Sequence, residues 1–145
     1  MTIRNWKFED ILRISQLEKE CFNEDAWDYK QIAHSFESEN FVGLAAEDGG
    51  EVVGYGAITV AVDTADVENI AVSEPYRFSG IGSAILDSLV EEAQKKGVKK
   101  LFLEVRVSNA NAMLLYLKHG FVGDYCRTRY YPDGEDALVM KKEIV

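Results

Sequence analysis

The chain lacks the features of a membrane or secreted protein. No apolar run in its 145 residues approaches the roughly 20 residues of a membrane-spanning helix, so we expect no membrane partner. Its start, M-T-I-R-N-W-K-F-E-D, has no apolar segment behind a basic one, so we expect no signal peptide. Only two cysteines are present, Cys21 and Cys126. They could bridge, but two reduced thiols in a cytoplasmic protein is the better interpretation.

Positive charge is also scarce. The chain has 16 Lys and Arg residues against 25 Asp and Glu residues, which gives a formal net charge of -9. A nucleic-acid-binding protein needs a basic stripe, so we expect no direct contact with nucleic acid. The negative charge suits a cationic substrate, such as an amine or a basic polypeptide. It equally suits a protein that uses charge only to stay in solution, and the sequence leaves both readings open.

Internal repeats, low-complexity tracts and linkers are absent as well. A chain of this length supports one hydrophobic core, and its 47% apolar and 28% charged residues are ordinary for a globular protein. We therefore expect a single domain that spans residues 1–145.

Hydrophobic periodicity predicts the element order β-α-α-β-β-β-α-β-α-β-β. A run of antiparallel strands thus meets a β-α-β crossover in the middle of the chain. The predicted strands are 3–6, 41–47, 51–62, 66–72, 100–106, 121–131 and 137–144, and the predicted helices are 8–22, 28–37, 81–96 and 110–118.

Local signals support several of these elements. In the first helix, Ile11, Ile14, Leu17 and Cys21 form the buried stripe, and Glu18 is placed elsewhere. Cys21 is therefore expected to be a core residue rather than a nucleophile. In the second helix, Asp28 and Gln31 have the spacing of a capping box. Within the third strand, Gly54 and Gly56 indicate a bulge or a close approach of another backbone.

The most informative stretch is residues 67–84, in which a strand leads through a loop into a helix. The loop carries the pattern Arg77-x-x-Gly80-x-Gly82. The first N–H groups of a helix have no internal partner, and the helix dipole favours negative charge there. Glycines allow a phosphate to approach the backbone without a Cβ in the way. The stretch therefore predicts a site for a ligand that carries phosphates.

A lone acid in an apolar strand is the second signal. Glu104 is the only acid in L-F-L-E-V-R, and strand alternation places it on one face with Phe102 and Arg106. The residue could be a functional base, part of a solvated face, or the partner of Arg106, and the pattern alone does not choose among these.

Together these residues resemble a known family. The order of elements, the loop that follows Ile70-Ala71-Val72, and the downstream Ser108-Asn109…Tyr116…Gly120-Phe121 are similar to the GCN5-related N-acetyltransferases (GNAT) over nearly the whole chain. The segments L-F-L-E-V-R, S-N-A-N-A, L-Y-L-K-H-G-F and R-Y-Y-P-D-G-E-D-A-L-V-M most resemble the ribosomal-protein alanine N-acetyltransferases (RimI type) and other enzymes that acetylate protein N-termini.

The resemblance implies a fold and a cofactor. The implied fold class is α+β with three layers, in which a mixed, mostly antiparallel twisted sheet of about seven strands is flanked by four helices. The implied cofactor is acetyl-coenzyme A, with its pyrophosphate on the N–H groups of the loop and its pantetheine arm along the preceding strand. No metal is implied. The expected cofactor-binding residues are Ile70, Ala71, Val72, Arg77, Phe78, Ser79, Gly80, Ile81, Gly82, Ser83 and Asn109.

It also implies catalytic roles for two residues. Glu104 would be the base, through a bridging water or with a raised pKa, because a carboxyl near ~4.3 is a poor direct base for an amine. Tyr116 would be the acid that serves the departing thiolate, although its helix also allows plain packing on Ala112 and Met113. Asn109 has the alternative of capping that helix.

Two tyrosines resemble the residues that shape the acceptor slot in N-terminal acetyltransferases. Tyr130 and Tyr131 occupy successive positions of a predicted strand, so we expect only one of them to line the slot, and core packing is the alternative. The acids Glu24, Asp25 and Asp28, in the loop between the first two helices, could attract a cationic substrate.

The expected function is acetyl transfer to a protein N-terminal α-amine, such as the N-terminal Ala of a ribosomal protein, by a monomer or weak dimer. A first alternative is a small-molecule amine or a lysine side chain as acceptor. A second is a non-catalytic module that binds coenzyme A. The presence of both Glu104 and Tyr116 argues against the second alternative.

Overall fold

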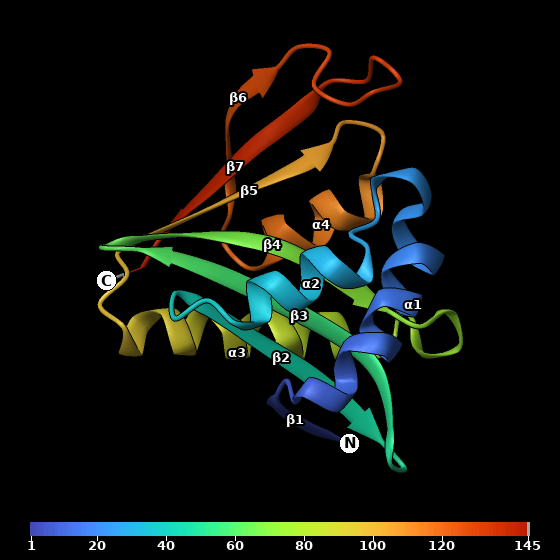
Figure 1. Cartoon of the computed structure of the whole chain (residues 1–145). Coiled ribbons are helices and arrows are strands. Elements are labelled where there is room, and N and C mark those ends of the chain that lie inside the picture. Colours follow the sequence, from blue (N-terminus) through green and yellow to red (C-terminus); the bar gives the residue numbers. More distant parts are fainter. Residues whose placement is uncertain (145) are drawn as a thin grey trace.

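The computed structural model describes residues 1–144, and Val145, the last residue of the expected domain, lies outside them. The described chain contains four α-helices and seven strands (Figure 1). The helices are α1 (Ile11–Phe22), α2 (Tyr29–Phe36), α3 (Ile81–Lys95) and α4 (Ala110–Lys118). The strands are β1 (Thr2–Asn5), β2 (Phe41–Asp48), β3 (Glu51–Ala61), β4 (Thr64–Val72), β5 (Lys100–Arg106), β6 (Val122–Arg127) and β7 (Ala137–Glu143).

The strands form one sheet in the order β1-β2-β3-β4-β5-β7-β6. Every neighbouring pair is antiparallel except β4 and β5, which α3 connects as a parallel crossover. Helices α1 and α2 cover one face and α3 the other, as Figure 1 shows, and each face has its own buried cluster. The predicted fold class is confirmed. No helix within residues 1–144 is long and apolar enough to cross a bilayer.

The local signals in the sequence form as predicted, except that Cys21 is only partly buried at the edge of the core and that Glu18 is misplaced. Ile11, Ile14 and Leu17 are fully buried, and both halves of the Asp28–Gln31 capping box are made at 2.9 Å. Glu18, however, is 1% exposed. It lies four residues after Ile14 and therefore on the same helix face, so its placement off the buried stripe was wrong.

The two glycines of β3 lie where other elements come close. A Cβ on Gly56 would stand 2.6 Å from Ile85 Cγ2 of α3. Opposite it the register shifts: Gly56 pairs with Ile70 and Ile58 with Val67. Three steps along β4 thus match two along β3, so β4 carries one extra residue at 68–69. A Cβ on Gly54 would stand 3.1 Å from the backbone oxygen of Ala71, so both the close backbone approach and the bulge that the glycines indicated are present.

Strands β4 and β5 separate soon after they meet. They pair only at Thr64↔Lys100, Ala65↔Leu101 and Asp66↔Phe102. Beyond these pairs the strands diverge (Figure 1). The splay opens the sheet from within and leaves the edge of β4 after Asp66 without a strand on that side.

The C-terminal hairpin differs from the prediction. The strand expected at 121–131 ends at Arg127, and residues 128–136 form a loop in which Arg129 has a φ of 49°. Tyr130 and Tyr131 therefore belong to this loop, which we call the β6–β7 loop. The C-terminal strand β7 forms as predicted within one residue.

Candidate active site

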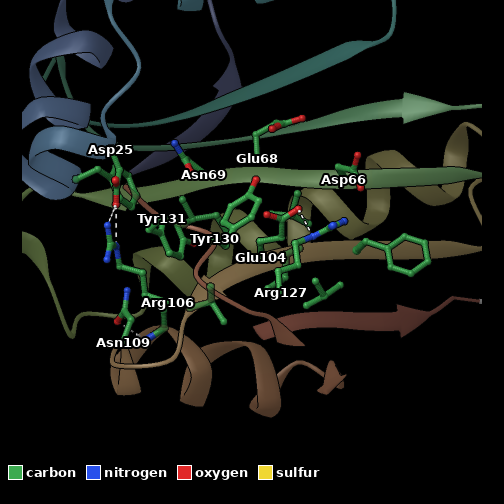
Figure 2. Close-up of a pocket in the computed structure, with 18 of the residues that line it drawn as sticks. Asp25, Asp66, Glu68, Asn69, Glu104, Arg106, Asn109, Arg127, Tyr130 and Tyr131 are labelled. Atoms are coloured by element: carbon green, nitrogen blue, oxygen red, sulfur yellow. Dashed lines mark hydrogen bonds and ion pairs between the residues drawn. The ribbon is translucent and has the colours of Figure 1, made fainter. Parts of the chain in front are cut away.

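The splay between β4 and β5 opens into a cleft of about 850 Å³ (Figure 2). Its walls are formed by β4, β5, α4 with the residue before it, the β6–β7 loop with parts of β6 and β7, and residues 22–27 at the end of α1 and after it. Its volume is that of a typical site for a small molecule or the end of a peptide.

Glu104 of β5 faces this cleft. Its carboxylate pairs with Arg127 Nε of β6 at 3.4 Å (Figure 2). The proposed pair with Arg106 is not formed, because the guanidinium of Arg106 turns to other carboxylates. The reading of Glu104 as the partner of Arg106 was therefore wrong, and its place in the cleft keeps the reading as a base open.

Two further acids of the cleft escaped the sequence argument. Asp66 and Glu68 lie on β4 across the cleft from Glu104 (Figure 2). Burial raises the pKa of Glu68, and the charges of Asp66 and Glu104 raise it further. Desolvation and then the charge of Glu104 raise the pKa of Asp66 as well. The signal was available, since both acids alternate with apolar residues in a strand just as Glu104 does.

Tyr116 enters the cleft from α4. Its side chain is 8% exposed and its ring packs edge-on against Phe121, with 5.7 Å between centroids. Burial raises the pKa of the Tyr116 phenol to about 12, and Tyr131 adds to the effect. The residue thus packs in the core and also borders the cleft, so the two readings of its role are compatible.

Both Tyr130 and Tyr131 line the cleft. Their rings meet edge to face, with 5.1 Å between centroids. The expectation that only one of them could do so was wrong, because the strand alternation on which it rested ends at Arg127. Burial raises the pKa of Tyr131 to about 12, whereas the adjacent Glu104 carboxylate is the main cause that raises the pKa of Tyr130.

Arg106 connects the two loops that form walls of the cleft. Its guanidinium lies 2.8 Å from each of three carboxylates: Asp25 between α1 and α2, and Asp133 and Glu135 of the β6–β7 loop. It also stacks 4.0 Å from the centre of the Tyr131 ring. This contact set explains why residues 128–136 leave the sheet, since their acids turn back to the end of β5.

The acids between α1 and α2 divide into two groups. Glu24 and Asp25 line the cleft, with Asp25 committed to Arg106. Asp28 instead caps α2 and does not reach the cleft.

A buried carboxylate stands behind this wall. Glu18 Oε1 accepts the backbone N–H of Trp27 at 2.9 Å, and the Asn69 amide Nδ2 donates to Glu18 Oε1 and Oε2 at 3.0 and 3.1 Å. Burial raises the pKa of Glu18 to about 7, and these two donors oppose the rise. Sequence gave no signal of this contact, because its partners lie on separate elements.

The glycine loop has the geometry of an anion site. Gly80 begins α3 with a φ of 88°, no side chain caps the helix, and the first intrahelical bond runs from Ala84 N to Gly80 O. The preceding N–H groups therefore point outward. A Cβ at Gly80 would meet nothing within 4 Å, so the space in front of the loop is open. These residues fit a phosphate group.

The side chains of Arg77 and Ser79 in this loop bind to other parts of the protein and do not extend into the space in front of α3. Arg77 donates through Nε to Val72 O at 2.9 Å and through Nη2 to Cys21 Sγ at 3.3 Å. Ser79 donates to the Tyr76 carbonyl. Phe78 is 90% exposed and has a φ of 61°, a conformation that few L-residues adopt.

The structure divides the predicted site residues between two places. Glu104, Tyr116, Asn109, Tyr130 and Tyr131 line the cleft together with Ile70. Asn109 also caps α4, since its Oδ1 accepts the Ala112 N–H at 3.2 Å. Residues 77–83 lie outside the cleft at the start of α3, and Ala71 and Val72 of β4 connect the two places.

The sequence of this chain is similar to those of known acetyltransferases. The model of the acetyltransferase (GNAT) family matches residues 8–121. The ribosomal protein bS18-alanine N-acetyltransferase of Escherichia coli K12 is 39% identical over 117 residues, covering 79% of this chain and 78% of that protein. An N-alpha-acetyltransferase of Sulfurisphaera tokodaii is 35% identical over 153 residues, covering 95% of this chain and 90% of that protein.

Among solved structures, the ribosomal-protein-S18-alanine N-acetyltransferase from Escherichia coli superposes with a TM-score of 0.89 at 34% identity, covering 99% of this chain and 93% of that one. The sequence match, the splayed sheet and the glycine loop at the start of α3 all indicate the same family. The chain therefore belongs to the GNAT acetyltransferase family.

Proposed function

We propose that this protein transfers the acetyl group of acetyl-coenzyme A to the N-terminal α-amine of a protein, and that its acceptor is the N-terminal alanine of a ribosomal protein. The observation that carries the proposal is the cleft itself. Glu104 and Tyr116 lie on different walls of it, and the β6–β7 loop and the segment between α1 and α2 form its other walls. The names of the relatives support the acceptor. The catalytic unit is a single domain that works as a monomer or weak dimer, without nucleic acid.

The proposed cofactor site consists of backbone groups that have no partner within a helix or a sheet of residues 1–144. The outward N–H groups at the start of α3 would hold the pyrophosphate, and the free edge of β4 at Ile70–Val72 would hold the pantetheine arm by sheet-like hydrogen bonds. Bound there, acetyl-coenzyme A supplies an activated acetyl thioester and a thiol leaving group. A backbone N–H near Ile70 would stabilise the negative charge that develops on the thioester carbonyl oxygen.

The chemistry favours an α-amine over a lysine. At pH 7, removing the proton from an α-amine of pKa near ~8 costs about 1.4 kcal/mol, and from a lysine near ~10.4 about 4.6 kcal/mol. The difference of roughly 3 kcal/mol is about two orders of magnitude in rate. Glu104 takes this proton through a water, because its carboxylate is held by Arg127 at the side of the cleft.

Tyr116 serves the leaving group mainly as a hydrogen-bond donor. Full proton transfer from a phenol with a pKa of about 12 to a thiolate near ~8.5 is uphill by about 5 kcal/mol. The neutral, buried phenol of Tyr116 still stabilises a developing thiolate by donation, and burial keeps it neutral at every pH of an ordinary assay.

A peptide panel tests the proposal. The protein is incubated with acetyl-coenzyme A and peptides that differ only in their first residue, and mass spectrometry locates the acetyl group. We expect transfer to the α-amine, with alanine preferred in first position. Acetylation of lysine side chains alone would refute the N-terminal reading and favour the alternative acceptor class.

Two variants test the mechanism within the same assay. Glu104→Gln and Tyr116→Phe should each lower kcat by roughly ten- to a hundredfold while the affinity for coenzyme A stays within about twofold. Glu143→Gln is the matched control, since Glu143 pairs with Lys100 at 3.7 Å away from the cleft. Wild-type turnover in both cleft variants, with coenzyme A still bound, would leave the protein as a binding module or move the chemistry to other residues.

A further inference from the structure

The buried contact between Glu18 and Asn69 joins two walls of the cleft. Trp27 lies in the wall between α1 and α2, Asn69 lies in the bulge of β4, and both line the cleft. Glu18 lies behind them on α1 and accepts hydrogen bonds from each, as described above. At 1% exposure it is itself shielded from the cleft. A charged side chain in this position costs free energy on burial, so its retention needs a reason beyond packing.

The contact also fixes which way the Asn69 amide faces. A carboxylate can only accept hydrogen bonds, so Nδ2 must be the atom that turns to Glu18. The carbonyl oxygen Oδ1 then points to the other side of the amide. Figure 2 shows Asn69 at the rim of the cleft, next to Glu68 on the same strand.

On the side of Glu18 there is little free space around the amide. A cavity of about 10 Å³ lies between Glu18, Asn69 and Tyr55. That volume is at the lower limit for one water molecule and far below the size of an amide group. The two hydrogen bonds to Glu18 therefore orient the Asn69 amide, and no other group can enter between the two side chains.

We propose that Asn69 is a binding residue for the acceptor, whose Oδ1 accepts a hydrogen bond from the α-amine, and that Glu18 is the positioning residue that fixes this amide and the Trp27 wall. The inference deepens the proposed function and rests on it. It separates the work of the two walls: Glu104 removes a proton from the amine, whereas Asn69 holds the amine in place before and after that step.

A contact of this kind predicts a particular kinetic pattern. The hydrogen bond to Asn69 exists both before and during acetyl transfer, so its loss weakens binding without changing the chemical step. For Asn69→Ala we expect the KM for the peptide to rise roughly tenfold, with kcat and the KM for acetyl-coenzyme A each within about threefold of wild type. A fall in kcat with an unchanged peptide KM would overturn the proposal.

An exchange of donor and acceptor tests the positioning role. Glu18→Gln keeps one acceptor oxygen for the Trp27 N–H but turns an NH2 group toward Asn69 Nδ2 in place of the second oxygen, and Asn69→Asp puts one carboxylate against another. Each single variant therefore sets two like groups against each other and weakens the contact. In the double variant Glu18→Gln/Asn69→Asp, the new amide donates to the new carboxylate, which still presents an oxygen to the cleft. Each single variant should lower kcat/KM for the peptide at least fivefold, and the double variant should return to within about threefold of wild type.

The experiment is run at pH 8.5 and well below each variant's unfolding temperature, with coenzyme A affinity measured in parallel. Wild-type kcat/KM in Glu18→Gln would overturn the proposal, and so would a double variant as slow as the product of the two single effects. If a residue here only supported the fold, the peptide and cofactor constants would change together. Failure of the wild-type protein to acetylate any peptide would instead refute the proposed function, independently of these comparisons.

Discussion

Arg106 Nη2 and Asp25 Oδ2 lie 2.8 Å apart, although 81 positions separate the two residues in the chain. The pair connects the end of β5 with the segment between α1 and α2, and the same guanidinium holds the β6–β7 loop through Asp133 and Glu135. One side chain thus sets the distance between the two loops that would enclose the acceptor.

Substitution of Arg106 should therefore affect the acceptor more than the cofactor. In Arg106→Lys a single ammonium replaces a planar fork and cannot satisfy three carboxylates in separate directions. We expect kcat/KM for the peptide to fall roughly tenfold, with coenzyme A affinity within about twofold. Arg13→Lys is the control, because Arg13 pairs with Glu51 at 3.4 Å on the far side of α1. Equal effects of the two substitutions would show that Arg106 does not organise the loops.

The two glycines of the phosphate loop should respond to alanine in opposite ways. Gly80 has a φ of 88°, so Gly80→Ala strains the backbone and should lower the free energy of unfolding by about 1–2 kcal/mol. Gly82 is helical, and a Cβ there would lie 3.7 Å from Leu115 Cδ2. Gly82→Ala should therefore raise the free energy of unfolding by up to about 1 kcal/mol.

Both substitutions should nevertheless weaken coenzyme A binding, because each places a methyl group where the pyrophosphate approaches the backbone. Urea unfolding gives the stability of each variant, and isothermal titration calorimetry gives the affinity. A Gly82→Ala variant that is stabilised and binds coenzyme A as wild type does would contradict the assigned phosphate site.

Glu18 should make the stability of the protein depend on pH. Its pKa is raised from 4.5 to about 7 in the folded protein, so between these values the folded state binds a proton that the unfolded state does not. Its contribution therefore favours unfolding at pH 8 and diminishes as the pH falls through 7 toward 4.5. The full change is about 3 kcal/mol.

Unfolding in urea at pH 5 and at pH 8 measures this contribution. Other carboxylates also titrate, and the raised pKa values of Asp66 and Glu68 act in the same direction. The informative quantity is therefore the stability of wild type minus that of Glu18→Gln at each pH. That difference should be larger at pH 5, and the same value at both pH values would show that Glu18 keeps an ordinary pKa.

A plot of log kcat against pH should show no decline caused by ionisation of Tyr116. With a pKa of about 12, Tyr116 stays protonated throughout the range in which the protein can be assayed. The log of kcat should thus rise with pH as the acceptor amine loses its proton and then stay level to pH 10. Tyr116→Phe should shift the whole profile downward without changing its shape. A decline near pH 9–10 in wild type that Tyr116→Phe removes would show that the phenol titrates much lower.

Sequence was sufficient where a structural signal is local. The Asp28–Gln31 capping box, the glycine loop at Gly80 and the glycines of β3 each act on neighbours in the chain or remove a side chain from a close contact. The order of elements likewise follows from periodicity. The main features of the fold could therefore be predicted, whereas the site role of Glu104 was implied only by the family resemblance, because its strand pattern left three readings open.

Contacts between distant parts of the chain could not be predicted in this way. Tyr130 and Tyr131 have the β-propensity of strand residues, but the carboxylates that follow them bind Arg106 and turn the segment into a loop. Glu18 resembles the other charged residues of α1, and its partners are the Trp27 N–H and the side chain of Asn69, which is 51 positions later. In both cases polar contacts between distant residues override a local preference.

The brief pairing of β4 with β5 has one more consequence. An unpaired strand edge on the outside of a protein recruits strands from other molecules and promotes aggregation. After Asp66 and Phe102, this sheet turns two such edges toward its own interior, where α4 and the β6–β7 loop stand in front of them. A slender chain, such as an acyl arm or the free end of a polypeptide, can reach those backbone groups, but a second folded sheet cannot. The fold thus keeps its hydrogen-bonding capacity for ligands thin enough to enter.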